Sequence, residues 1–234
     1  MSGMMSSSSG PGGPVVQGIA TLTTAMTTNI IPDQEYLLQG SILDPHVDVL
    51  KHRLGGLCDN VDPSSSGHET FQEREMVFTI RGSSGQPLTL RIRRPLDPHS
   101  DIPWQLRYVG QAELKNRATV VRSCYEIACS SNAIEFLLEL GCRLDYEFVA
   151  KGFIFRKGRM KVIISKIFKL NSSSNLPPGA PLNMESLEPQ TNSHLVELSI
   201  LAPSGNDAVA EDMKNFAEQL KPLVLLDKID PPRA

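Results

Sequence analysis

The stretch that decides the fold is Glu147-Phe-Val-Ala-Lys-Gly-Phe-Ile-Phe-Arg-Lys-Gly-Arg-Met-Lys161, which continues as Val162-Ile-Ile-Ser-Lys-Ile-Phe-Lys-Leu170. β-Branched and aromatic residues dominate both sides of Lys157-Gly158, so we predict two long strands joined by a tight turn. Residues 151–170 contain seven basic side chains and no acidic one. A basic hairpin of this length suggests either a wall that binds an anion or a docking surface for a partner.

A period-two alternation of apolar and polar residues predicts strands in most of the remaining chain. Met76, Phe78 and Ile80, for example, share one face of a strand that begins at Glu75. The predicted strands are 34–43, 75–81, 88–93, 104–108, 118–129, 143–156, 160–170 and 194–201, with 223–229 as a candidate ninth. An open sheet of this size would leave long edges. We therefore predict a mainly β (α+β) fold, an antiparallel β-barrel of about 8–9 strands with about three flanking helices.

Three predicted helices interrupt the strands. The first has Asp44 as its N-cap and Pro45 in its first turn. The second begins after Asn132 and stops at Gly141. The third covers 206–221, with charged residues opposite its apolar stripe.

The 234 residues divide by composition. Residues 1–32 are rich in Ser, Gly and Thr and hold no aromatic or charged side chain, so we predict a disordered segment. Residues 33–232 are predicted to form a single β-barrel domain, with a flexible Pro/Ser-rich loop at about 171–192. The net charge of −3 gives the whole chain no attraction to nucleic acid or anionic membranes, so any such contact needs a local patch.

Targeting signals and metal-binding motifs are not evident in the sequence. No Lys or Arg precedes Lys51, and no apolar run approaches the roughly 20 residues that cross a bilayer, so we expect a soluble chain without a leader peptide. The cysteines, Cys58, Cys124, Cys129 and Cys142, contain no Cys-x-x-Cys pair, and the five histidines are scattered. We expect reduced thiols, and no metal site, cofactor site or catalytic residue.

A metal-dependent tunnel-type triphosphatase is the alternative function. Such enzymes line a barrel with cations that bind polyphosphate and with paired glutamates that hold a divalent metal. The basic side chains that alternation could bring into one lumen are Arg91, Arg93, Arg107, Lys161 and Lys169. The metal half is incomplete, because the first strand supplies only Glu35 where two acids are needed. The one well-placed acidic alternation elsewhere, Asp145-Tyr-Glu147, is expected to face solvent or to pair with a lysine of a neighbouring strand. We therefore predict that the protein is not an enzyme.

Aromatic residues lie among the basic residues of the hairpin, in a pattern that resembles a base-stacking surface. They are Phe153, Phe155 and Phe168. A barrel wall needs bulky inward side chains, so we assign these rings to the core and expect no sequence-specific DNA binding.

Several sequence blocks carry a family resemblance. They are Glu35-Tyr-Leu-Leu-Gln-Gly40, Leu50-Lys-His-Arg-Leu-Gly-Gly-Leu-Cys-Asp-Asn60, Pro103-Trp-Gln-Leu-Arg-Tyr-Val-Gly110 and Asp212-Met-Lys-Asn-Phe-Ala-Glu-Gln-Leu-Lys-Pro-Leu-Val224. With the hairpin at 147–161, they resemble the family of Mediator of RNA polymerase II transcription subunit 18 over residues 33–232. The resemblance implies a nuclear, non-catalytic structural subunit of the Mediator head module, a coactivator scaffold that links regulators to RNA polymerase II, directly or indirectly. It also implies a barrel related to the triphosphatase tunnel, a heterodimer with subunit 20, and tethering by the C-terminal helix of subunit 8 near subunit 17.

The hairpin carries apolar residues on both faces, which predicts a docking site on one of them. We expect one face to fill the barrel and the other to be covered by a helix of this chain or by a partner. The predicted docking residues are Ile163 and Ile167, with Lys161 and Lys169 on the same face to attract an acidic helix.

Deletion of residues 1–32 is expected to change the melting temperature by less than about 2 °C, because the segment lacks the apolar content to pack against a core. Calorimetry of the full-length and shortened proteins checks this. A large fall on deletion would show that the segment is bound to the barrel.

Overall fold

The fold is described from a computed structural model, which covers residues 33–59, 68–81, 87–96, 102–113, 118–170, 182, 187–203 and 207–229. The predicted disordered segment and most of the predicted loop at 171–192 lie outside these residues. The elements are, in chain order, β1 (Asp33–Leu43), the 3-10 helix η1 (Asp44–His46), α2 (Val47–Leu57), β2 (Glu69–Arg81), β3 (Pro87–Pro95), β4 (Trp104–Val109), β5 (Val120–Cys129), α3 (Ala133–Glu139), β6 (Arg143–Lys157), β7 (Met160–Lys169), β8 (Glu188–Pro189), β9 (Ser193–Pro203) and α4 (Asp207–Glu218).

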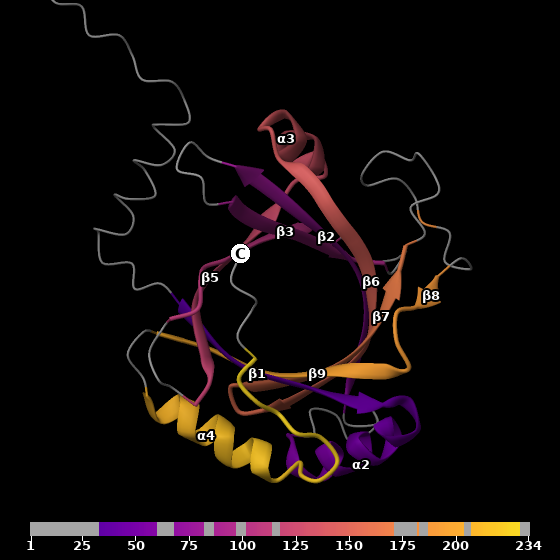
Figure 1. Ribbon diagram of the computed structural model, residues 1–234, viewed down its shortest axis with the longest axis vertical. Coiled ribbons are helices and arrows are strands. Elements are labelled where there is room, and N and C mark those ends of the chain that lie inside the picture. The colour runs from indigo at the N-terminus through magenta and orange to yellow at the C-terminus, as the bar shows by residue number, and fades with distance from the viewer. Residues whose placement is uncertain are drawn as a thin grey trace, which may run out of the picture. The chain divides into compact units, whose positions relative to one another are not determined.

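The strands of the described residues form one antiparallel sheet that closes on itself (Figure 1). Their order is β6-β2-β3-β4-β5-β1-β9-β7-β8, and β6 also pairs with β7. This closing pair is the predicted basic hairpin, with Lys157 opposite Met160 and Phe148 opposite Lys169. Its turn holds Gly158 at a φ of 55°, a conformation that glycine adopts without strain. The closed antiparallel barrel with flanking helices confirms the predicted fold class.

The prediction for the ninth strand was wrong. Residues 223–229 make only an isolated bridge in the described sheet, between Asp227 and Gln39. Val224 and Leu226 of this segment are buried in the apolar core instead, so their side chains serve packing rather than strand pairing. The ninth strand is β8, which pairs with the end of β7 inside the stretch predicted as a loop.

The predicted N-caps of the first two helices are not made by side chains. Asp44 instead accepts two hydrogen bonds from Lys166 Nζ, at 2.6 and 2.7 Å, and lies 3.0 Å from Nδ1 of His194. A charge-assisted bond to a lysine is stronger than a bond to a backbone amide, so the carboxylate turns toward β7 and β9. The predicted stop at Gly141 is confirmed by its φ of 92°.

The larger apolar core lies outside the barrel, between its wall and two helices. Figure 1 shows α2 and α4 packed against the part of the wall that contains β1 and β9. The buried side chains that meet there include Tyr36, Leu50, Leu54, Phe155, Val162, Ile164, Val196, Leu198, Met213 and Phe216. A second cluster lies under α3, where Ile134 and Leu137 pack on Met76, Phe78 and Trp104. Burial of each large side chain contributes about 1.5–3 kcal/mol, so both clusters fasten their helices to the wall.

No helix in the described part of the chain is long and apolar enough to cross a membrane.

Candidate functional site: the barrel interior and two outer surfaces

Side chains at alternate positions of the wall point away from the outer helices and into the barrel. On β7, Val162 and Ile164 lie in the outer core, so the odd-numbered residues face the interior. The structure therefore places all four predicted docking residues on the inward face of β7. Their degree of burial varies along the strand: Lys161, Ile163 and Ile167 are half-buried, and Lys169 is exposed.

This placement shows that we assigned the two faces of the hairpin the wrong way round. We expected the face with Val162, Ile164 and Phe155 to fill the barrel, but α2 and α4 cover it from outside. Helices can bury a barrel wall from its outer side, which leaves the inner side free to carry polar groups. Ile163 thus lies opposite Ile154 and Glu197 within the barrel rather than on an outer surface. A docking role for the four residues stays a hypothesis.

A buried cluster forms around Glu35, on the inward face of β1. Its Oε2 accepts a hydrogen bond from Nε of Arg122 at 2.8 Å and lies 2.8 Å from Nη2 of the same guanidinium group, and its Oε1 accepts a hydrogen bond from Arg107. Burial on its own raises the pKa of Glu35, but the positive charges of Arg107 and Arg122 outweigh it and hold this pKa below its ordinary value. The carboxylate is therefore charged and fully engaged at neutral pH.

Further ion pairs engage three more inward arginines. The pairs are Arg91 with Glu75 at 2.9 Å, Arg93 with Glu126 and with Glu73 (the latter at 3.7 Å), and Arg156 with Glu69 at 3.1 Å. Burial lowers the pKa of Lys161, Arg93 lowers it further, and Glu73 partly offsets both. The arginines predicted to share a lumen thus face it, but glutamates of neighbouring strands bind them.

Sequence reasoning missed Glu73 and Glu75 as inward acids. The strand was predicted to start at Glu75, whereas β2 starts at Glu69, so the alternation Glu73-Arg-Glu75 was overlooked. The alternation that was noticed is disrupted by a β-bulge: Glu147 binds Arg74 at 2.6 Å, and Asp145 accepts a bond from Thr79. If we had extended the period-two pattern upstream to Glu69, it would have placed Glu73 and Glu75 together on the inward face.

A metal cluster is not formed among the described residues of the barrel. No group of three or more His, Cys, Asp or Glu there is placed to hold a metal ion. Glu35, the one carboxylate expected on the first strand, is bound to two guanidinium groups instead. The four cysteines are free, and burial raises the pKa of the Cys58 thiol to about 11, which keeps it protonated at neutral pH.

Glu197 is an interior carboxyl that makes no ion pair with a described residue, although Gln39 Nε2 donates to its Oε1 at 2.8 Å. Burial raises its pKa, and the Gln39 bond offsets only part of this. A carboxyl whose folded pKa is raised destabilises the fold once the pH exceeds its unfolded value of 4.5, increasingly until the folded pKa is reached.

We therefore expect Glu197→Gln to raise the melting temperature at pH 7.5 and to have little effect at pH 4. Thermal unfolding of both proteins at the two pH values checks this. A lower melting temperature for Glu197→Gln at pH 7.5 would show that the charged carboxylate stabilises the barrel.

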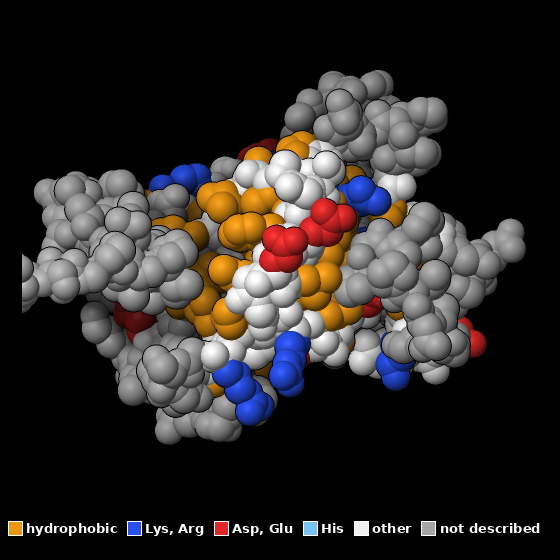
Figure 2. Space-filling view, turned by 90° about the horizontal axis from the view of Figure 1, so that it is seen from above, with side chains coloured by type: hydrophobic (Ala, Val, Ile, Leu, Met, Phe, Trp, Pro, Cys, Tyr) orange, Lys and Arg blue, Asp and Glu red, His pale blue; other side chains and the backbone are white. Residues whose placement is uncertain are grey.

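An apolar surface surrounds α3 on the outside of the barrel. Phe136 is 58 % exposed and Leu140, four residues later, is 44 % exposed, so they share one flank of the helix. Glu135 and Glu139 are exposed beside them. Figure 2, which looks onto this side, shows apolar side chains gathered around acidic ones. We call Phe136, Leu140, Glu135 and Glu139 the α3 surface.

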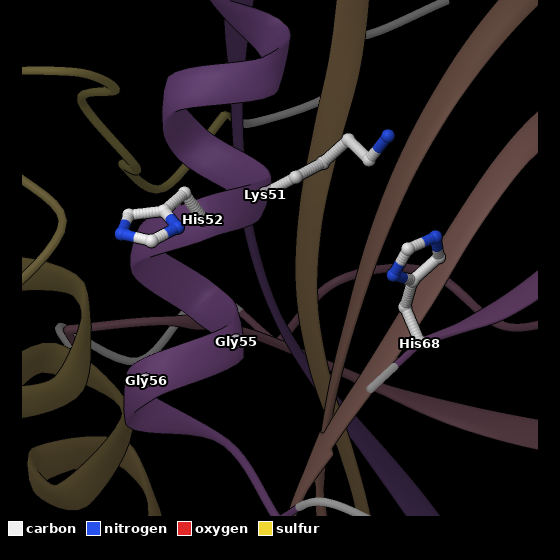
Figure 3. A pocket seen from close by; sticks show the side chains of 5 residues that line it. All are labelled: Lys51, His52, Gly55, Gly56 and His68. Carbon is white, nitrogen blue, oxygen red and sulfur yellow. The ribbon is translucent and has the colours of Figure 1, made fainter. Parts of the chain in front are cut away.

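A groove runs along α2 (Figure 3), on the side of the barrel opposite α3 (Figure 1). It has a volume of about 430 Å³ and is lined by Lys51, His52, Gly55, Gly56 and His68. The two glycines form the floor on the helix, with His52 to one side and His68 to the other. We call these five residues the α2 groove.

These features define the class of protein, which is a closed antiparallel barrel with ion pairs in its interior and helices packed on its outside. Solved structures share this fold. One is the Mediator head module of Schizosaccharomyces pombe, at a TM-score of 0.63 and 17 % identity, over 84 % of this chain and 98 % of the other. Another is a conserved hypothetical protein of Pyrococcus furiosus, at a TM-score of 0.50 and 13 % identity, over 81 % of this chain and 94 % of the other.

The family follows from sequence. The family model described as Med18 protein matches residues 34–102 and 93–233. Relatives named Mediator of RNA polymerase II transcription subunit 18 are 52 % identical in Aedes aegypti, over 89 % of this chain and 90 % of the relative, and 51 % identical in Danio rerio, over 89 % and 94 %. The chain belongs to the Med18 family, which confirms the resemblance found in the sequence.

Proposed function

We propose that this protein is a structural subunit of the Mediator complex, located in the nucleus and built into the head module. The observation that carries the proposal is the family match over nearly the whole barrel, together with relatives named as Mediator subunit 18. The barrel also shares its fold with a chain of a structure titled as a Mediator head module. In this role the protein links regulators to RNA polymerase II transcription through protein–protein contacts.

We propose that the barrel does not catalyse a reaction. A triphosphatase needs lumenal cations free to bind phosphate and carboxylates free to bind a metal. In this interior the arginines and glutamates bind each other. Such pairs fasten neighbouring strands, so the charged interior is better suited to holding the barrel closed than to binding substrate.

Within the head module we propose contacts with subunit 20, with the C-terminal helix of subunit 8 and, nearby, with subunit 17. The α3 surface is proposed as the site for subunit 20. Its large exposed apolar side chains can supply the desolvated centre of an interface. Its glutamates favour a partner surface that is apolar at the centre and basic at the rim.

The test is co-expression of this chain with subunits 8 and 20, followed by size-exclusion chromatography. Co-elution of the three proteins is expected. Separate elution would contradict the scaffold function. The same sample, incubated with a nucleoside triphosphate and magnesium or manganese, is expected to release no phosphate, and release that Glu35→Gln abolishes would support the enzyme instead.

A further inference from the structure

The floor of the α2 groove is formed by two glycines that packing within this chain does not require. Gly55 and Gly56 both lie in the last turn of α2, where glycine favours the helix less than alanine does. Elsewhere in the chain a glycine is required by close packing, as at Gly152, where a Cβ would lie 1.9 Å from the carbonyl oxygen of Ile164. At Gly55 and Gly56 a Cβ would meet no atom within 4 Å. The glycines keep a stretch of helix backbone uncovered and the space above it open.

The side chains that line the groove are hydrogen-bond donors, and Lys51 among them also lies 3.3 Å from Oδ1 of the exposed Asp48. Lys51 and His52 lie one turn before the glycines, and His68 lies across the groove (Figure 3). None of the five lining residues is acidic. The amine and imidazole groups can all donate hydrogen bonds to carboxylates.

An aromatic side chain adds apolar area next to these donors. The Phe153 ring lies 4.1 Å from Lys51 Nζ and 5.1 Å from the His68 ring, and it is only partly buried. Phe153 belongs to the basic hairpin, so the groove runs beside its outward face. Donors around an open, partly apolar floor suit a peptide that carries both carboxylates and apolar side chains.

We propose that the α2 groove is a docking site for an acidic peptide segment of a partner subunit, which lies against Gly55 and Gly56 and places its carboxylates beside Lys51, His52 and His68. This proposal rests on the function proposed above and adds the place and the chemistry of one contact. It also relocates the acidic partner expected at the hairpin from the inward face of β7 to an outer surface beside β6.

The experiment measures binding of this chain to a purified complex of subunits 8 and 20. Gly56→Leu fills the groove but favours the helix, so we expect at least tenfold weaker binding with no fall in melting temperature. His52→Glu should weaken binding and reduce its dependence on salt. The matched control is Val49→Leu, an exposed position of the same helix that does not line the groove, and it should leave binding unchanged.

A photo-reactive residue at position 52 identifies the occupant within the assembled complex. We expect it to cross-link to an acidic segment of one partner. The proposal is overturned if stable Gly56→Leu protein binds like the wild type, or if the cross-link joins a segment without acidic residues, or nucleic acid. These outcomes differ from a failure of the wild-type chain to bind the two subunits at all, which would contradict the proposed function itself.

Discussion

Replacement of Glu35 by glutamine is expected to lower the melting temperature by roughly 10 °C, the largest effect of any single conservative change in the interior. Glu35 is 6 % exposed, and it separates the guanidinium groups of Arg107 and Arg122. Glutamine has almost the same shape but leaves two adjacent positive charges uncompensated within the barrel. Removing one partner of such a buried cluster costs about 3 kcal/mol or more.

The dependence on pH distinguishes this loss of charge pairing from a loss of packing. Because the folded pKa of Glu35 lies below its ordinary value of 4.5, its contribution is complete above that pH and is lost as the pH falls through the folded pKa. The difference between the wild type and Glu35→Gln should therefore be constant near neutrality and shrink in acid. The control is Glu69→Gln, whose partner Arg156 is 48 % exposed, and its cost should stay below about 1 kcal/mol. Equal costs for the two variants would contradict the central role of Glu35.

The double variant Phe136→Ser with Leu140→Ser is expected to lose co-elution with subunit 20 while keeping its melting temperature. Truncation of two central apolar groups typically weakens an interface by more than about 2 kcal/mol, or roughly thirtyfold. Both side chains are well exposed in the isolated chain, so their removal should leave the fold nearly unchanged. Binding is measured by titration at fixed salt concentration, and stability by thermal unfolding.

A matched control lies on the opposite flank of the same helix. Leu138 is 40 % exposed, and its neighbour Leu137 points into the cluster under α3. Leu138→Ser should change neither binding nor stability by much. If Leu138→Ser weakened binding as strongly as the double variant, the contact would not be specific to the proposed flank. If the double variant bound normally, subunit 20 would have to contact another surface.

Strands and helices were predictable because each is encoded by local periodicity. The alternation around Met76 and Phe78 and the turn at Lys157-Gly158 indicate strands without knowledge of what they pack against. The glycine at position 141 likewise marks the end of its helix, and its positive φ confirms that reading. Side-chain caps were less predictable, because Asp44 has a distant partner, Lys166, that no local pattern reveals.

The sequence indicated which arginines share the interior face, but we assigned the wrong face of β7 to the interior. Alternation shows that two residues share a face, but it does not say which face lies inside. Arg91, Arg93 and Arg107 were correctly grouped as inward cations, since they are charged and lie on strands. The outer helices decided the orientation of β7: once α2 and α4 bury Val162 and Ile164, Lys161 and Ile163 must point inward.

The sequence alone determined the strand-rich architecture, the family and the basic character of the closing hairpin, because these depend on residue types and short-range spacing. Only the tertiary structure decided that the charged face of the wall is the inner one and that its arginines are neutralised. That outcome depends on partners distant in sequence, such as Glu35 with Arg107 and Arg122, which closure of the barrel brings together. The tertiary structure likewise opened the α2 groove, because His68 meets α2 only when β2 is in place.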